Sequence, residues 1–236
     1  MIADPGTVNR LDDLGGDPVM GSPRKICFDI ETGPLPLPEL ESMMPEFEAP
    51  SNYKDEEKIA RAIEAKKLAW IDKAALDART GRVLAIGYSV INPEAHHGCQ
   101  IICDSEGEKQ LLESWWDFYR KSRNVGAHWI GHNIRAFDFP FLVRRSLKHG
   151  LCLPSGLVAN GIRYDRLIVD LMEVWACGEF KTPISLDNLA KFLGVGAKTG
   201  NGKDFYGLYK TDRDKALDYL RNDVKLVKEC WEVMGW

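Results

Sequence analysis

The sequence predicts an α/β fold in which a mixed central β-sheet is flanked by α-helices. Segments with the two-residue period of a strand alternate along the chain with segments of helical spacing. Two neighbouring strand segments lie close enough in sequence to form an antiparallel hairpin, which gives the sheet its mixed character. The length of 236 residues suits one domain, expected over residues 24–236 after a loose leader over residues 1–23 that lacks periodicity.

The first strand is expected to begin at Lys25. Apolar Ile26, Phe28 and Ile30 alternate there with other side chains, which is the period of a strand. Prolines from Pro34 onward end it, because proline fixes the backbone and donates no hydrogen bond to a neighbouring strand.

An insert over residues 34–80 separates this strand from the next. It begins with a Pro-rich stretch that predicts a loop, and residues 54–79, rich in Ala, Lys and Glu, predict one long helix or two short ones. The apolar segment 83–91 is then expected to be a strand, with residues 100–104 paired to it as a hairpin.

Helices and strands alternate through the rest of the chain. Ser105 and Glu108 have the spacing of a capping box, which predicts that a helix begins there. A strand is expected over residues 125–130, followed by a helix over residues 140–148 that Pro140 opens. Residues 162–171 are expected to be extended at their end, Ser185 caps a helix over residues 185–192, and a final helix covers residues 211–234.

Composition and charge exclude several classes of protein. Lys and Arg number 31 against 35 Asp and Glu, so the net charge is −4 and the whole surface is not that of a nucleic-acid coat protein. A nuclease remains compatible with this charge, because its acids gather at the centre of the site. Six cysteines without CxxC pairs predict reduced thiols and a cytoplasmic location. No segment has the length of a membrane span, and the N-terminus lacks a signal pattern.

Asp29 and Glu31 stand two positions apart on the first predicted strand. Their side chains therefore leave the same face, roughly 6–7 Å apart along the backbone. Like charges at this distance repel each other unless a cation lies between them, and carboxylate oxygens suit Mg²⁺ or Mn²⁺. A solvated strand end would equally explain the pair when it is taken alone.

Tyr219 and Asp223 stand four positions apart on the final predicted helix and share one of its faces. They flank an apolar stripe, so we expect them at the boundary between core and solvent, within reach of a cleft. A rim tyrosine and a surface aspartate are the alternative. Asp138, bracketed by Phe137 and Phe139, stands where a helix is expected to begin, and there it would serve either the site or the cap of that helix.

Three segments of the chain, taken together, resemble the motifs of a nuclease family. They are Phe28 to Thr32, Asn133 to Leu142 and Tyr219 to Asp223. In this order, with every acid present, they resemble the three exonuclease motifs of the DEDDy 3′–5′ exonucleases, which are ribonuclease H-like nucleases. The resemblance covers about residues 24–233 and is greatest to stand-alone proteins similar to the proofreading domain of family B DNA polymerases.

The resemblance implies a ribonuclease H-like fold and two divalent metal ions, Mg²⁺ or Mn²⁺, at the scissile phosphate. Asp29 would bridge both ions, Glu31 and Asp223 would complete the first metal site, and Asp138 would hold the second ion. Tyr219 would orient the attacking water, since a phenol with a pKa near 10 is a poor base at neutral pH.

The resemblance also implies contacts with the nucleic acid. Thr32 and Gly33 would lie near the 3′-terminal nucleotide, and Asn133, which would steady the segment around Asp138, is grouped with them as substrate-binding. Basic residues near the second and third motifs are expected to form a positive rim that attracts phosphates. They are Arg135, Arg144, Arg145, Lys148, Lys181, Lys191, Lys198, Lys203 and Lys210.

The expected function is metal-dependent 3′–5′ hydrolysis of single-stranded DNA, with release of nucleoside 5′-monophosphates. Two alternatives stay open: a 3′–5′ exoribonuclease, because contacts to the 2′-hydroxyl are not readable from sequence, and a non-catalytic nucleic-acid-binding accessory subunit. The chain ends at Trp236, so no polymerase module is expected in it, and a polymerase or repair partner would act in trans. No membrane partner is expected.

Overall fold

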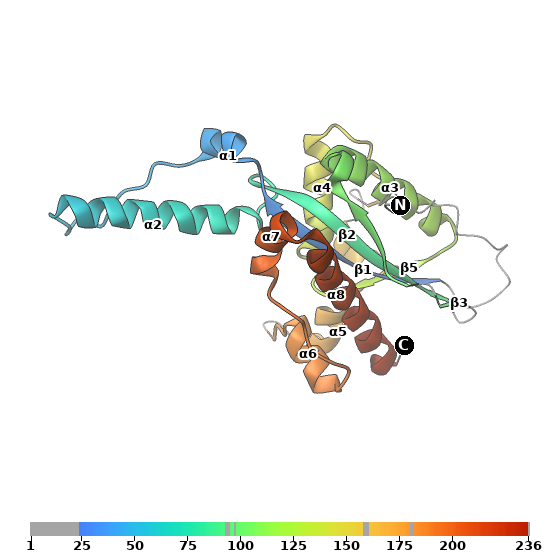
Figure 1. The fold of residues 1–236 in the computed structure, drawn as a ribbon. Helices are drawn as coiled ribbons and strands as arrows, with labels where there is room; N and C mark the ends of the chain where they lie inside the picture. The colour runs from blue at the N-terminus through green and yellow to red at the C-terminus, as the bar shows by residue number, and fades with distance from the viewer. Residues whose placement is uncertain (1–23, 93–94, 97, 158–160, 180–181, 236) are drawn as a thin grey trace, which may run out of the picture.

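The structure, a computed structural model, describes residues 24–235 except for residues 93–94, 97, 158–160 and 180–181. The predicted leader therefore lies outside the described residues. Figure 1 shows a central sheet with helices on both faces and a helical arm that projects from one end of the molecule.

The sheet is mixed, as predicted. Its six strands are β1 (Lys25–Pro34), β2 (Gly81–Asn92), β3 (Ala95–His96), β4 (Gln100–Cys103), β5 (His128–Gly131) and β6 (Ile168–Asp170). They lie in the order β3-β2-β1-β5-β6, and β4 pairs with β2. β2 is antiparallel to β1 and to β4, whereas β5 is parallel to β1 and to β6. The predicted hairpin is confirmed.

Eight α-helices accompany the sheet within the described residues. They are α1 (Leu37–Met43), α2 (Glu56–Ala74), α3 (Glu108–Asn124), α4 (Asp138–Lys148), α5 (Leu171–Ala176), α6 (Leu186–Leu193), α7 (Gly202–Thr211) and α8 (Arg213–Met234). In the part of the chain that the structure describes, none of the helices combines the length and apolarity needed to span a membrane.

Two apolar cores cover the two faces of the sheet. On one face, α3 and α4 pack aromatic side chains onto β1 and β5, and the rings of Phe28, Trp115 and Trp129 have centroids 5.0–5.5 Å apart. On the other face, α5 to α8 pack against side chains such as Leu84 and Ile130. β1 is therefore buried from both sides, and its carboxylates cannot be a solvated strand end.

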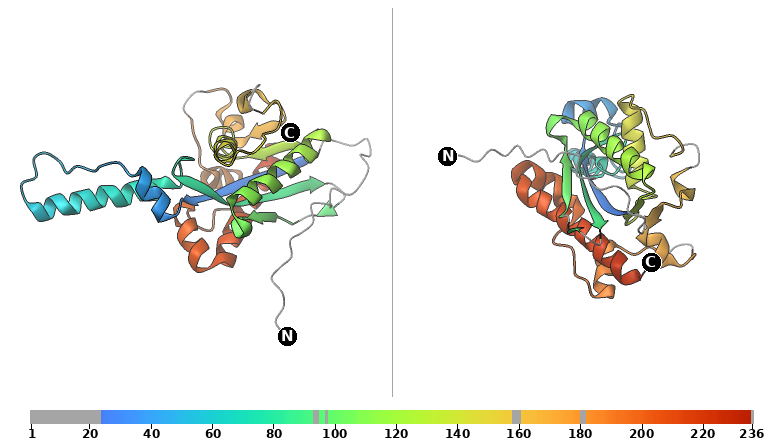
Figure 2. Two further views of the ribbon diagram at one scale, coloured as in Figure 1. Left: turned by 90° about the horizontal axis from the view of Figure 1, so that it is seen from above. Right: turned by 90° about the vertical axis from the view of Figure 1, so that its right-hand side faces the viewer.

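The insert at residues 34–80 forms the projecting arm (Figures 1 and 2). α1 and α2 account for its helices, so the predicted 54–79 helix is confirmed as one continuous α2. The arm is joined to the end of β1 by two hydrogen bonds. The Thr32 hydroxyl donates to the Ala75 carbonyl at 2.7 Å, and the Leu35 N–H donates to the Thr80 carbonyl at 2.9 Å.

The predicted capping box at Ser105 and Glu108 is wrong. A short 3₁₀ turn covers Asp104–Glu106, and α3 begins at Glu108 after Gly107 without a side-chain cap. The Glu108 carboxylate turns inward and accepts hydrogen bonds from Arg145 Nη2 at 2.7 Å and from the Val83 N–H at 2.8 Å. A buried guanidinium competes successfully for the carboxylate because charge-assisted bonds are stronger than a cap.

Candidate active site

Three carboxylates from distant parts of the chain meet at one point of the sheet. Asp29 and Glu31 of β1 and Asp223 of α8 each place a carboxylate oxygen within 4.8 Å of the other two. β1 and β2 slip in register between Glu31 and Thr32, so a β-bulge lies directly beside the acids. Bulges re-aim side chains at functional edges of sheets, which is their role beside this cluster.

A glycine on β2 allows α8 to approach so closely. Gly87 is the register partner of Asp29, and a Cβ atom there would lie 2.9 Å from side-chain atoms of Leu220 and Val224. Any larger residue would push α8 away from the sheet. The absence of a side chain at Gly87 thus brings Asp223 to the carboxylates of β1.

Asp138 lies beside this cluster as the first residue of α4. Phe137 occupies the cap position, and the helix has no side-chain cap, so the helix-cap interpretation of Asp138 is wrong. Its Oδ1 instead accepts a hydrogen bond from the Ile30 N–H at 3.3 Å, between Asp29 and Glu31 in sequence. The structure therefore brings the four predicted acids together, although Asp138 stands outside the tight group of three.

Tyr219 and Asp223 are buried, and the prediction that they lie at the boundary with solvent is wrong. Tyr219 is 6% exposed and Asp223 is 0% exposed. The segment that leads into α7, together with α7 itself, covers them, and the ring of Phe205 lies 6.1 Å from that of Tyr219. No hydrogen bond of good geometry from a described residue reaches the Tyr219 hydroxyl or the Asp223 oxygens.

Burial and mutual repulsion disfavour the ionised acids. Burial, followed by the negative charge of Asp223, raises the pKa of Asp29 to about 7. Burial followed by the charge of Asp29 raises the pKa of Glu31 and of Asp138 well above the ordinary values, and burial also raises that of Asp223. Three buried acids and the half-buried Asp29, all with raised pKa values, form a site that gains free energy when it takes up cations.

One cation of the chain already lies in the cluster. The Lys198 ammonium is 2.5 Å from Asp223 Oδ2 and 5.2 Å from the centroid of the Tyr219 ring. The charges of Asp223 and Asp29 outweigh the burial of this ammonium and raise the pKa of Lys198. The sequence indicated Lys198 only as part of a basic rim, because nothing in its local pattern shows that the loop folds back onto α8.

The raised pKa values predict how the metal-free protein responds to pH. A folded-state pKa of Asp29 near 7, against 3.8 for the unaffected group, means that ionisation opposes folding. Stability in EDTA should therefore fall as pH rises from about 5 to 8, by a total on the order of a few kcal/mol. The lowered pKa of Glu108 does not compensate, because its contribution is complete above the ordinary pKa of 4.5. Burial lowers the pKa of His128 and of His132, which adds stability as pH rises toward 6.5, but this contribution is the same in wild type and in Asp29→Asn.

Urea unfolding at four pH values measures this dependence. The Asp29→Asn protein should show a shallower decline than the wild type, since the titrating group has been removed. A free energy of unfolding that stays level or rises between pH 5 and pH 8 in the wild type would contradict the burial of ionisable acids.

The three predicted substrate-binding residues lie close to the acids in different settings. Thr32 uses its hydroxyl to hold the base of the arm. Gly33 lies against Leu84 and Tyr206, where a Cβ atom would approach their side chains to 2.7 and 2.8 Å. Asn133 has a left-handed backbone with φ 63°. Asparagine takes this conformation more readily than most residues, and such backbone positions recur at functional sites.

Asp170 was not identified from the sequence and organises the loop that carries Asn133. Its Oδ1 accepts from the Asn133 N–H at 2.8 Å, and its Oδ2 accepts from the Arg135 N–H at 3.0 Å. Its Oδ1 also accepts from the Met172 N–H at 3.0 Å and so caps α5. At 3% exposure, this carboxylate fixes the loop between β5 and Asp138 from the end of β6.

Replacement of Asp170 by alanine should loosen this loop. Three N–H groups would lose their acceptor, which predicts a loss of stability of about 1–3 kcal/mol and a fall in catalytic rate of about 10-fold or more as Asn133 and Asp138 shift. Chemical unfolding and steady-state cleavage measure the two effects. Asp117→Ala, which removes an exposed acid of α3, is the control for stability; equal rates for the Asp170→Ala protein and wild type would contradict the role.

The predicted basic rim is only partly present. Arg145 is buried against Glu108, and Arg135 donates to backbone carbonyls, including that of Asp165 at 3.0 Å. Both arginines therefore stabilise the interior of the protein, and Lys198 belongs to the acid cluster rather than to a surface rim. Lys181 lies outside the described residues, while Arg144, Lys148, Lys191, Lys203 and Lys210 are exposed.

Comparisons with known proteins identify a family for this chain. The sequence model of one family, described as predicted 3′–5′ exonucleases related to the exonuclease domain of PolB, matches residues 76–226. This range includes Asp138, Tyr219 and Asp223, whereas Asp29 and Glu31 precede it. No curated protein matches the chain.

Among solved structures, the family B DNA polymerase from the hyperthermophilic archaeon Pyrobaculum calidifontis is similar to this chain. The TM-score is 0.53 and the sequence identity 18%, over 88% of this chain and 24% of the polymerase. The chain thus spans about a quarter of that polymerase, and the likeness confirms the ribonuclease H-like α/β fold. Because the family match covers well over half of its length, the chain belongs to the family of predicted 3′–5′ exonucleases related to the exonuclease domain of family B DNA polymerases.

Proposed function

We propose that the protein is a metal-dependent 3′–5′ exonuclease that removes nucleoside 5′-monophosphates from single-stranded DNA. The observation that carries the proposal is the convergence of Asp29, Glu31 and Asp223 within 4.8 Å, with Asp138 beside them. Such a group has no structural purpose of its own, because the buried like charges repel one another.

The residues of the cluster fit divalent metal ions. Carboxylate oxygens are hard ligands of the kind that Mg²⁺ and Mn²⁺ take, and burial raises the pKa of each acid. We propose that Asp29, Glu31 and Asp223 hold one ion and that Asp29 and Asp138 hold a second. When bound, the ions supply charge stabilisation at the scissile phosphate and lower the pKa of a coordinated water.

Protein groups supply orientation around these acids. Asp170 holds the loop of Asn133 against β6, and we propose that Asn133, Thr32 and Gly33 contact the 3′-terminal nucleotide. The Tyr219 hydroxyl, which has no hydrogen-bond partner of good geometry among the described residues, is available to orient the attacking water. Burial raises the pKa of Tyr219 above its ordinary value, so the phenol stays protonated and would orient the water by hydrogen bonding rather than take its proton.

Replacement of Tyr219 by phenylalanine tests this orienting role. The ring and its packing stay in place, and removal of the buried hydroxyl should change the free energy of unfolding by about 1 kcal/mol or less. The rate of cleavage should fall by about 10- to 100-fold with Mn²⁺ affinity unaltered, because no metal ligand is lost. Steady-state kinetics and calorimetry give both values, and an unchanged rate would remove Tyr219 from the mechanism. Tyr206→Phe, on the neighbouring α7, is the matched control.

The reaction and its substrate can be tested in one experiment. DNA and RNA strands of the same sequence, carrying different 5′ dyes, are incubated together with the protein and Mg²⁺ or Mn²⁺. The proposal predicts a ladder that shortens from the 3′ end of the DNA strand, absent in EDTA, with 5′-monophosphates as products. Faster shortening of the RNA would assign the exoribonuclease alternative, and binding without cleavage would support an accessory subunit.

The biological setting is proposed on the same basis. We propose that the protein acts in the cytoplasm on 3′ ends delivered by a polymerase or repair protein in trans. All six cysteines are free, which suits a reducing compartment.

A further inference from the structure

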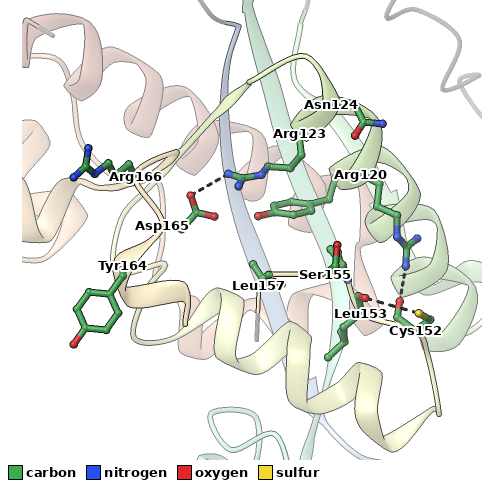
Figure 3. Close-up of a pocket in the computed structure, with 13 residues that line it drawn as sticks. Arg120, Arg123, Asn124, Cys152, Leu153, Ser155, Leu157, Tyr164, Asp165 and Arg166 are labelled. Carbon is green, nitrogen blue, oxygen red and sulfur yellow. Dashed lines mark hydrogen bonds and ion pairs between the residues drawn. The ribbon is translucent and has the colours of Figure 1, made fainter. Parts of the chain in front are cut away.

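A second candidate binding surface lies at the opposite ends of the parallel strands from the acids. A hollow of about 1020 Å³ is walled by the end of α3, by residues 152–157 and by residues 164–166 (Figure 3). These last residues directly precede β6, and α3 ends just before β5, so the hollow lies at the amino ends of both strands. The acids lie toward the carboxyl ends.

The walls of the hollow are positively charged in a protein of net negative charge. Three arginines, Arg120, Arg123 and Arg166, line it with a single acid, Asp165. Arg123 neutralises that acid through an ion pair of 3.0 Å. Figure 3 shows the three guanidinium groups spaced along the hollow, with Arg120 beside Cys152 at one end and Arg166 at the other.

Two of these arginines have charge to offer a ligand. Arg120 donates one hydrogen bond to the Cys152 carbonyl, which leaves its charge uncompensated. Arg166 is exposed and has no partner among the described residues. Arg123, by contrast, lies in the last turn of α3 and already forms an ion pair with Asp165.

An exposed aromatic residue lies at the Arg166 end of the hollow (Figure 3). Tyr164 is 76% exposed, more than any other large apolar or aromatic side chain of the described residues. Arg163 and Arg166 are close to it in the chain, and both are exposed. An exposed ring at the end of a row of guanidinium groups offers a stacking platform next to phosphate contacts, which is the chemistry that binds unpaired nucleotides.

The edge of the sheet connects this hollow to the site. β6 is the last strand of the sheet in the described part of the chain, and it leads from Arg166 to Asp170, which anchors the loop of Asn133. Four residues of extended chain cover about 13 Å, a distance that a few nucleotides can bridge.

We propose that the surface formed by Arg120, Tyr164 and Arg166 binds the backbone and bases of single-stranded nucleic acid several nucleotides away from the 3′ end that is cleaved. This inference rests on the proposed function for the identity of the ligand. It predicts that long strands bind more tightly than short ones, and that the gain comes from this surface.

The test measures binding in EDTA, where no cleavage occurs. Fluorescence anisotropy with 5′-fluorescein (dT)20 and (dT)4 is followed between 50 and 200 mM NaCl for the wild type, for Arg120→Gln/Arg166→Gln and for Tyr164→Ala. The double variant should bind (dT)20 about 10-fold more weakly, with a salt slope smaller by about 1.4, since each phosphate contact on a single strand contributes about 0.7. Tyr164→Ala should weaken (dT)20 by about 5-fold or more at an unchanged salt slope.

The controls make the outcome specific. Lys58→Gln/Arg61→Gln on α2 removes the same charge from the arm and should leave (dT)20 binding unchanged. Cleavage of (dT)4 with Mn²⁺ should be equal in all variants. Unchanged affinity and salt slope for (dT)20 would overturn the inference, as would equal weakening of (dT)4. Failure of the wild type to cleave, with length-dependent binding intact, would instead contradict only the proposed catalytic function.

Discussion

Replacement of Asp29 by asparagine should abolish cleavage and at the same time stabilise the metal-free protein. The first effect follows because Asp29 is the acid shared by both proposed metal ions, and its loss should cost about 10³-fold in rate, equivalent to roughly 4 kcal/mol. The second follows because burial and the charge of Asp223 raise the pKa of Asp29 to about 7, so the ionised group opposes folding at pH 8.

These opposite signs separate a functional role from a structural one. Replacement of a residue that only supports the fold lowers stability and activity together. Replacement of Asp29 by asparagine should instead raise the stability of the metal-free protein and abolish its cleavage activity. Asp218→Asn, an exposed acid on α8, is the matched control and should change neither. Cleavage by Asp29→Asn within 10-fold of the wild-type rate would remove the cluster from catalysis.

Replacement of Lys198 by methionine should strongly destabilise the protein in the absence of metal. The Lys198 ammonium lies 2.5 Å from an Asp223 carboxylate that is entirely buried. Loss of one partner of a buried ion pair leaves the other uncompensated, at a cost of about 3 kcal/mol. The cost should be greatest at pH 8 and smaller at pH 6, where the acids with raised pKa values take up protons instead.

Metal should restore much of this stability, because a divalent ion replaces the missing positive charge. Unfolding midpoints of Lys198→Met in EDTA and in Mn²⁺ measure the effect, and Lys191→Met, which removes an exposed lysine paired with Asp187, is the control. If the Lys198→Met protein unfolds in EDTA at the wild-type midpoint, the ion pair with Asp223 does not support the fold.

Local sequence patterns predicted the strands of the sheet and the acids of the site, because both features depend only on the spacing of residues that are close together in the sequence. The alternation around Phe28 and the spacing of Asp29 and Glu31 depend only on the period of a strand. α6 was equally readable: the Ser185 side chain accepts from the Asn188 N–H, and Gly194 ends the helix with φ 72°. The order of the three acid-bearing segments completed the prediction of the family.

Features that depend on distant segments were not predictable in the same way. α7 was missed because its sequence begins with glycine-rich residues that resemble a loop, although Asn201 caps it. The cover that α7 provides explains why Tyr219 and Asp223 are buried rather than at the rim. Lys198 pairs with Asp223, 25 residues away, and Asp170 binds the Asn133 N–H, 37 residues away; a single sequence carries no signal for such long-range pairs.

Diffraction at the manganese absorption edge tests the central claim most directly. Crystals grown with Mn²⁺ and thymidine 5′-monophosphate, a product of the proposed reaction, would locate the ions without reference to activity. We predict two anomalous peaks, both within coordination distance of Asp29, one also bound by Glu31 and Asp223 and the other directed toward Asp138. Ordered nucleotide with no anomalous peak at Asp29 would contradict the assignment of these acids as a metal-dependent nuclease site.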